Sequence, residues 1–92
     1  MIHVIIPIHN RLNLSINCLN SLTKLINYNE LNIIIVDDGS TDGSRHILKK
    51  KFPEITIING TGSLYWCGSV NLGVKYVLKI SKTNDWVLLV NN

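Results

Sequence analysis

Apolar positions along the chain gather into four short runs that are rich in β-branched residues. Runs of this length, with little alternation between apolar and polar positions, are typical of strands buried on both faces of a parallel sheet. The pattern therefore predicts strands of this kind at His3–Ile6, Leu31–Val36 and Trp86–Val90, and a weaker run predicts a further strand at Ile55–Ile58.

The segments between these runs place apolar residues at intervals of three and four, which is the spacing of one helix face. They predict three helices, at Leu12–Asn27, Ser44–Phe52 and Ser69–Ser81. The buried face of the first helix is predicted to carry Cys18, Leu19, Leu22, Leu25 and Ile26. That of the third is predicted to carry Val70, Val74, Val77 and Leu78.

Strands and helices therefore alternate along the chain. This order predicts an α/β fold of three layers, in which helices cover both faces of a mostly parallel sheet joined by right-handed crossovers. The 92 residues are 46% hydrophobic and 16% charged, which fits one globular domain over residues 1–92.

Charge and cysteine usage narrow the class of protein. The net charge of +3 is mild, and the run Lys49–Lys51 is typical of a solvated helix end, so we expect no nucleic-acid partner. Cys18 and Cys67 are predicted to be small core residues of a protein in a reducing compartment, the cytoplasm. No Cys/His cluster has zinc spacing, and no apolar stretch reaches the ~20 residues of a membrane span.

Polar residues concentrate directly after the predicted strands, in residues 7–11, 37–42, 59–67 and 91–92. The carboxyl ends of parallel strands meet at one edge of a sheet, and open α/β sheets bind ligands there. The sequence therefore predicts a ligand site at this edge.

Two features of these loops each allow two interpretations. Asp37 and Asp38 either cap the next helix, a task for which Ser40, Thr41 or Asp42 would suffice, or accept hydrogen bonds from a nucleoside. The adjacent Tyr65 and Trp66 form either an apolar plug on the sheet or a wall of the ligand pocket.

Two glycines that follow Tyr65 and Trp66 also bear on a ligand site. Gly68 is predicted to open the third helix with N–H groups that suit phosphate. Gly73, inside that helix, implies close packing or a close ligand, since glycine costs about 1 kcal/mol there.

The sequence excludes two common nucleotide-binding motifs. The segment after the first predicted strand is residues 7–12, PIHNRL. A dinucleotide-binding domain has G-x-G-x-x-G after its first strand, and this segment has no glycine. The chain also lacks the G-x-x-x-x-G-K-[ST] of a P-loop. His9 taken alone is more typical of an ordinary loop residue than of a catalyst, and His3 and His46 have no partner visible in the sequence.

Four segments together resemble the family 2 glycosyltransferases of the GT-A fold. Residues 4–11 are similar to the family's first strand and P-x-(Y/H)-N loop, and residues 34–42, IIVDDGSTD, to its VDDGSTD signature. Residues 66–73 are similar to its G-x-x-N-x-G segment, and residues 86–92 to the strand that leads into its DxD motif. The resemblance implies the Rossmann-like N-terminal half of a GT-A fold.

The resemblance also implies the residues of a nucleotide-sugar site. Pro7, Ile8, His9 and Asn10 would line the base pocket, and Arg11 would belong to the same nucleotide-sugar site. Asp38 would hold the base, and Asp37 would support the base or the ribose. Trp66, Gly68 and Asn71 would border the donor, and Asn91 and Asn92 would begin the metal loop. Ser69 and Val70 depart from the Ala-Arg that many members carry there.

By resemblance, the parent enzyme would move a sugar from a UDP- or dTDP-type donor to a hydroxyl of a saccharide or lipid-linked saccharide, with inversion. It would need Mg²⁺ or Mn²⁺, serve cell-surface polysaccharide synthesis, and work in the cytoplasm or peripherally at the inner face of the membrane. The chain ends one position before the expected metal-binding Asp, so we expect it to be truncated and to lack transferase activity alone.

Two hypotheses from other classes remain open. One is a stand-alone nucleotide-binding or interaction module without catalysis, which the next codons of the gene would distinguish from a truncated enzyme. The other is a structural fragment that forms a homo-oligomer through an open sheet edge.

Overall fold

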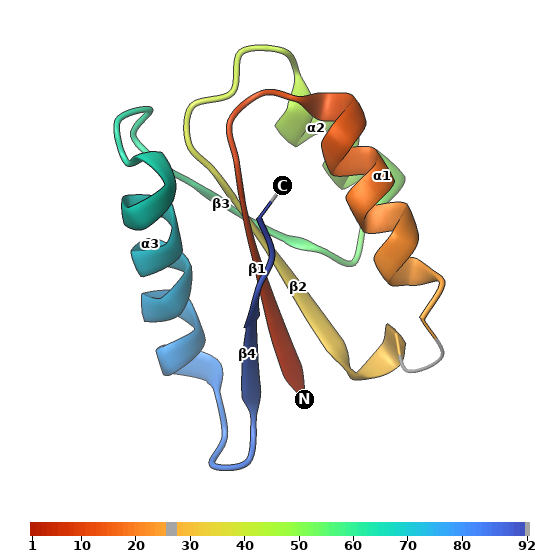
Figure 1. Cartoon of the computed structure of the whole chain (residues 1–92), viewed down its shortest axis with the longest axis vertical. Coiled ribbons are helices and arrows are strands. Elements are labelled where there is room, and N and C mark those ends of the chain that lie inside the picture. The colour runs from red at the N-terminus through yellow and green to blue at the C-terminus, as the bar shows by residue number, and fades with distance from the viewer. Residues whose placement is uncertain (26–27, 92) are drawn as a thin grey trace.

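The computed structural model describes residues 1–25 and 28–91. Its centre is a parallel sheet of four strands in the order β3-β2-β1-β4 (Figure 1). The strands are β1 (Ile2–Ile8), β2 (Leu31–Asp37), β3 (Thr56–Asn59) and β4 (Trp86–Leu89). Each lies within two residues of its predicted position, and the prediction of a parallel α/β sheet is confirmed.

Helices cover both faces of this sheet, as predicted. α1 (Leu12–Thr23) and α2 (Ser44–Lys51) lie on one face, and α3 (Tyr65–Ile80) lies on the other (Figure 1). A short 3₁₀ helix, η1 (Tyr28–Glu30), precedes β2.

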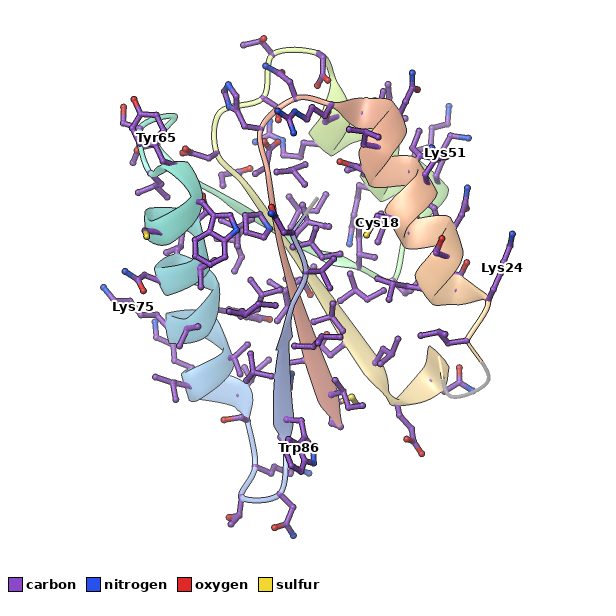
Figure 2. The ribbon with its side chains drawn as sticks, viewed as in Figure 1. Cys18, Lys24, Lys51, Tyr65, Lys75 and Trp86 are labelled. Atoms are coloured by element: carbon purple, nitrogen blue, oxygen red, sulfur yellow. The ribbon has the colours of Figure 1, made fainter. Side chains whose placement is uncertain are left out.

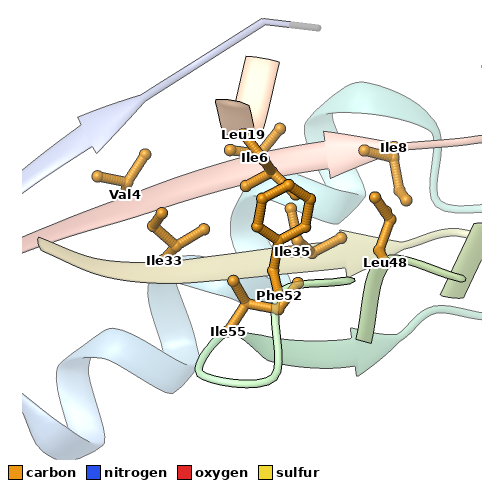
Figure 3. Close-up of a cluster of buried hydrophobic side chains, with 9 residues drawn as sticks. All are labelled: Val4, Ile6, Ile8, Leu19, Ile33, Ile35, Leu48, Phe52 and Ile55. Atoms are coloured by element: carbon orange, nitrogen blue, oxygen red, sulfur yellow. The ribbon is translucent and has the colours of Figure 1, made fainter. Parts of the chain in front are cut away.

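Two clusters of buried side chains hold the layers together. The cluster under α1 and α2 includes Leu19 and Leu48 against β-branched residues of β1 and β2 (Figure 3). The cluster under α3 joins Ile5, Ile34 and Val77. Because β1 and β2 supply both clusters, their side chains are buried on both faces, as their unbroken apolar runs predicted.

The first helix is shorter than predicted. Lys24 and Leu25 donate their N–H groups to the carbonyls three residues back, at 3.3 Å and 3.1 Å, which tightens and ends the last turn. Leu25 therefore lies beyond α1 and is 52% exposed, not on the buried face. Ile26 and Asn27, also predicted in this helix, lie outside the described residues.

The prediction that the fourth strand is buried on both faces is wrong. β4 is an edge strand, and its side chains are 45–74% exposed. The reason is that α3 packs against β1 and β2 rather than over β4. For the same reason Leu78 points away from the sheet and is 72% exposed, whereas Val77 is buried.

Neither cysteine is a fully buried core residue, so the prediction for Cys18 and Cys67 is wrong. Cys18 is half-buried, and this burial raises the pKa of its thiol. Cys67 is exposed in the first turns of α3, one residue away from the stripe that faces the sheet.

A buried histidine at the amino-terminal edge of the sheet has partners that the sequence did not reveal. His3 is 3% exposed, and its Nε2 lies 2.9 Å from Asp85 Oδ2. Asn32 Nδ2 lies 3.1 Å from the other ring nitrogen, so the ring can accept from Asn32 at Nδ1 and donate to Asp85 at Nε2. Asp85 also lies 3.5 Å from the amino group of Met1. The network ties the loop before β4 to β1.

Asp85→Asn should remove an acid-sensitive part of the stability. The N–H of Lys82, followed by the His3 ring, lowers the pKa of Asp85 from 3.8 to about 2. Its contribution is therefore complete above about pH 4 and is lost as the pH falls through 3.8 toward 2. In urea titrations the variant should be less stable at neutral pH and converge with the wild type near pH 2. A constant difference between the two curves over this range would contradict the assignment.

Candidate functional site

A cleft of about 330 Å³ lies at the carboxyl ends of the strands, beside the first turn of α3. Figure 2 labels Tyr65 at this end of α3 and Trp86 at the opposite end of the molecule. The cleft is lined by Pro7, Ile8, His9, Asn10, Arg11, Asp38, Gly62, Tyr65, Trp66, Ser69 and Asn91. These residues come from four separate parts of the chain, which the parallel topology brings to one edge.

The loop after β1 is held by the side chain of Asn10. Its Oδ1 accepts the N–H groups of Thr41 at 2.8 Å and Asp42 at 3.2 Å, and its own N–H donates to Ser40 Oγ at 2.7 Å. Asn10 and Arg11 both adopt the left-handed conformation, with φ of 60° and 56°. Asn tolerates this conformation better than most residues. The loops after β1 and β2 thus form one unit.

His9 is oriented by the next strand. Its Nδ1 lies 2.6 Å from the carbonyl oxygen of Asp38, so this nitrogen carries the proton and donates. Its Nε2 is then an acceptor, 3.5 Å from Asn10 Nδ2. The exposed imidazole is therefore held in a fixed orientation at the cleft.

The two aspartates at the end of β2, Asp37 and Asp38, have different partners, and neither caps α2. Asp37 Oδ1 accepts the N–H of Ser40 at 3.0 Å, which closes a local turn. The carboxylate of Asp38 accepts three N–H groups from the loop before α3: Gly62 at 2.7 Å, Leu64 at 2.9 Å and Tyr65 at 2.9 Å. The capping interpretation thus holds for Asp38, but the helix is α3 rather than the one that follows it in sequence.

Asp42 supplies the acceptor at the start of α2, where Ser40 or Thr41 was also considered. It accepts the N–H of Ser44 at 3.0 Å and the Ser44 hydroxyl, and it reaches the N–H of Leu12 at 3.3 Å. The Ser44 hydroxyl is the main cause of its lowered pKa. One carboxylate therefore serves the first turns of both α1 and α2, while Ser40 and Thr41 contact Asn10 instead.

The wall of the cleft opposite the β1 loop is the start of α3, and it differs from the prediction. The helix begins at Tyr65, not at Gly68, because Asp38 supplies acceptors for the N–H groups of Leu64 and Tyr65. Gly68 lies one turn inside the helix and donates to the carbonyl of Leu64 at 3.0 Å, so its N–H does not face a phosphate. Tyr65 and Trp66 are 78% and 49% exposed. They line the cleft rather than plug the sheet.

Gly73 packs closely against the sheet. A Cβ at this position would lie 2.7 Å from Ile5 Cγ2 and 3.2 Å from Val36 Cγ2. Of the two interpretations, close packing is therefore the one that holds. The glycine lets α3 approach β1 and β2.

Most of the predicted site residues meet at the cleft, namely Pro7, Ile8, His9, Asn10, Arg11, Asp38, Trp66 and Asn91. Asp37, Gly68 and Asn71 do not line it, and Asn92 lies outside the described residues. Tyr65, which also lines the cleft, was predicted as one of two alternatives, whereas Gly62 and Ser69 line it and were not predicted. Gly62 could have been found from the paired glycines at 60 and 62.

The residues at the cleft do not fit a metal site by themselves. Within residues 1–25 and 28–91, no group of three His, Cys, Asp or Glu side chains could hold a metal ion. The one carboxylate that lines the cleft already accepts three backbone N–H groups.

A cleft at the carboxyl edge of a parallel, three-layer sheet is the place where open α/β domains bind ligands. The family model described as glycosyl transferase family 2 matches residues 3–91. The chain therefore belongs to the family 2 glycosyltransferases, and the resemblance of its four motifs is confirmed.

A solved structure supports the fold. The mannosyltransferase PcManGT from Pyrobaculum calidifontis, in complex with GDP-Man and Mn²⁺, matches with a TM-score of 0.72 at 22% identity. The match covers 82% of this chain and 24% of that one, so the chain spans about a quarter of its length. The fold is thus the GT-A type. No curated protein sequence matches the chain significantly.

Proposed function

We propose that the cleft binds the nucleotide of a nucleotide-diphosphate sugar. In this proposal the chain is the donor-binding part of an enzyme that transfers the sugar to an acceptor hydroxyl with inversion. One observation carries the proposal: four segments that are distant in sequence, and that match the family's motifs, converge on one cleft. Its lining combines aromatic rings with a few fixed polar groups, as small-molecule sites do.

The hydrogen bonds of Asp38 favour a pyrimidine base. A carboxylate has about four acceptor positions, and three at Asp38 are taken by backbone N–H groups. Room for one further N–H suits uracil or thymine, each of which has a single ring N–H at its pairing edge. Guanine has two adjacent donors and needs both oxygens. This argument supports a UDP- or dTDP-type donor.

Calorimetric titration of the chain with UDP, dTDP and GDP, each with and without Mn²⁺, tests the proposal. UDP or dTDP should bind about tenfold more tightly than GDP, since one hydrogen bond to a charged group is worth about that much. Mn²⁺ should change the affinity by less than about twofold, because the described residues form no metal cluster. Failure of the folded chain to bind any nucleotide would reject the proposal. Preferential binding of GDP would reject the base assignment.

We further propose that Mg²⁺ or Mn²⁺ and the catalytic base act from outside the described residues. Asp38 is 4% exposed and its carboxylate accepts three backbone N–H groups, so it is not placed to take a proton from an acceptor. On this proposal the chain binds a donor without turning it over. The same observation favours the second candidate, a nucleotide-binding module without catalysis, and the codons after Asn92 distinguish the two.

The acceptor that we propose is a saccharide or lipid-linked saccharide of a cell-surface polymer. Among the described residues, no helix is long and apolar enough to cross a membrane. The exposed Leu78 and Trp86, with Lys79 between them in sequence, support a peripheral position at the inner face of the membrane.

The unpaired edge of β4 supports pairing with a second copy of the chain.

A further inference from the structure

We propose that Asp38 is a positioning residue that sets the width of the cleft. Its carboxylate holds the wall segment, which we define as residues 62–65, against the carboxyl end of β2. The inference rests on the proposed function for what the cleft binds. It assigns Asp38 a role in the protein without ligand, in addition to any contact with a base.

The first observation is that Asp38 connects three parts of the site. Its N–H donates to the carbonyl of Ile8 at 3.0 Å, and its carbonyl accepts from His9 at 2.6 Å. Its carboxylate accepts the three N–H groups of the wall segment. Hydrogen bonds to an ionised acceptor at the start of a helix are among the stronger ones in proteins. The wall is therefore fixed to the same residue as the opposite side of the cleft.

The second observation is the close approach of the backbone at Gly39 and Gly60 to the wall segment and to the Asp38 carboxylate. A Cβ on Gly39 would lie 2.7 Å from Gly62 Cα, and a Cβ on Gly60 would lie 2.7 Å from Asp38 Oδ1. Gly39 also has φ of 74°, which favours glycine. Any side chain at position 39 must push the wall segment into the cleft or away from it.

The third observation is where the unusual backbone conformations occur. Within the described residues, the non-glycine residues with positive φ are Asn10, Arg11 and Tyr65, and all three line the cleft. Tyr65, at φ of 55°, donates its N–H to Asp38. Such conformations persist only where surrounding contacts over-determine them. Asp38 supplies that contact for Tyr65.

Trp66 reports the position of the wall, since it follows the wall segment directly in α3. The chain has two tryptophans, so Trp86→Phe leaves Trp66 as its only indole. In this background we compare Asp38→Asn, Gly39→Ala and Gly43→Ala. Gly43 is the matched control: its φ of 80° resembles that of Gly39, but a Cβ there meets only Ile47 Cδ1, at 3.7 Å.

Asp38→Asn and Gly39→Ala should each shift the emission maximum of Trp66 in the ligand-free protein and weaken UDP binding by about tenfold or more. Asp38→Asn acts by replacing one acceptor oxygen with a donor that faces N–H groups. Gly39→Ala acts by displacing Gly62. Gly43→Ala should leave the emission unchanged and the affinity within about twofold, although its backbone strain is similar.

The alternative, a purely direct contact between Asp38 and the base, predicts a different result. Asp38→Asn would then weaken UDP binding without a shift in emission, and Gly39→Ala would bind UDP as the background does; this pair of results would overturn the inference. If Asp38→Asn does not fold, the comparison of Gly39→Ala with Gly43→Ala, in emission and in UDP affinity, tests the inference. If the background binds no UDP, the proposed function fails, and the ligand-free emission still decides whether Asp38 and Gly39 position the wall.

Discussion

Ile35→Ala should lower the free energy of unfolding by about 2–5 kcal/mol, the range for truncating a fully buried aliphatic side chain. Ile35 lies in the inner strand β2, is 0% exposed, and belongs to the cluster that also holds Leu48 and Phe52 (Figure 3). A single domain of this size has about 5–15 kcal/mol of stability in total. The variant should therefore lose a large share of its folded population, which urea unfolding followed by circular dichroism measures.

Leu88→Ala is the matched control for this prediction. Leu88 is also aliphatic and lies in a strand, but in the edge strand β4, where it is 47% exposed. We expect its truncation to cost less than about 1 kcal/mol, because much of its surface is already in contact with water. Equal losses in the two variants would mean that β4 is covered in solution and that the burial described for this edge is incomplete.

The elements of the fold were predictable because each follows from a local pattern. Unbroken β-branched runs predicted β1 and β2, and helical spacing predicted the three helices. The exposure of β4 was not predictable, because its apolar run is as strong as those of β1 and β2. Whether such a run is covered depends on where α3 crosses the sheet, and that crossing is fixed by the contact of Gly73 with Ile5.

The location of the site was predictable, whereas its internal contacts were not. Parallel topology alone places residues 7–11 and Asp38 at one edge. The start of α3 depends on Asp38. The carboxylate of Asp38 accepts the N–H of Tyr65, although the two residues are 27 positions apart in the sequence. Local capping rules consider only neighbouring residues, so they placed the helix start at Gly68 instead.

The role of Asn10 illustrates the same limit. Sequence similarity placed this residue in a base pocket. In the structure its side chain is occupied by the N–H groups of Thr41 and Asp42, more than 30 positions away. Its contribution to the cleft is therefore to join two loops.

Trp66→Ala should weaken UDP binding by about 5-fold to 150-fold, because stacking of a base on an aromatic ring is worth about 1–3 kcal/mol. Trp66 lines the cleft and is 49% exposed in the first turn of α3, so an aromatic face is available without rearrangement of the core. Its removal leaves the hydrogen bonds of Asp38 in place, since those come from the backbone of residues 62–65. Calorimetric titration with UDP measures the loss.

Trp86→Ala separates this effect from a general loss of aromatic surface. Trp86 is 74% exposed at the opposite end of the molecule from Tyr65 (Figure 2), so its removal should leave UDP affinity unchanged within about twofold. A loss confined to Trp66→Ala would place the base against α3. Equal affinity in both variants would place it elsewhere in the cleft, and His9, whose imidazole is fixed by the carbonyl of Asp38, would then be the stacking partner to test.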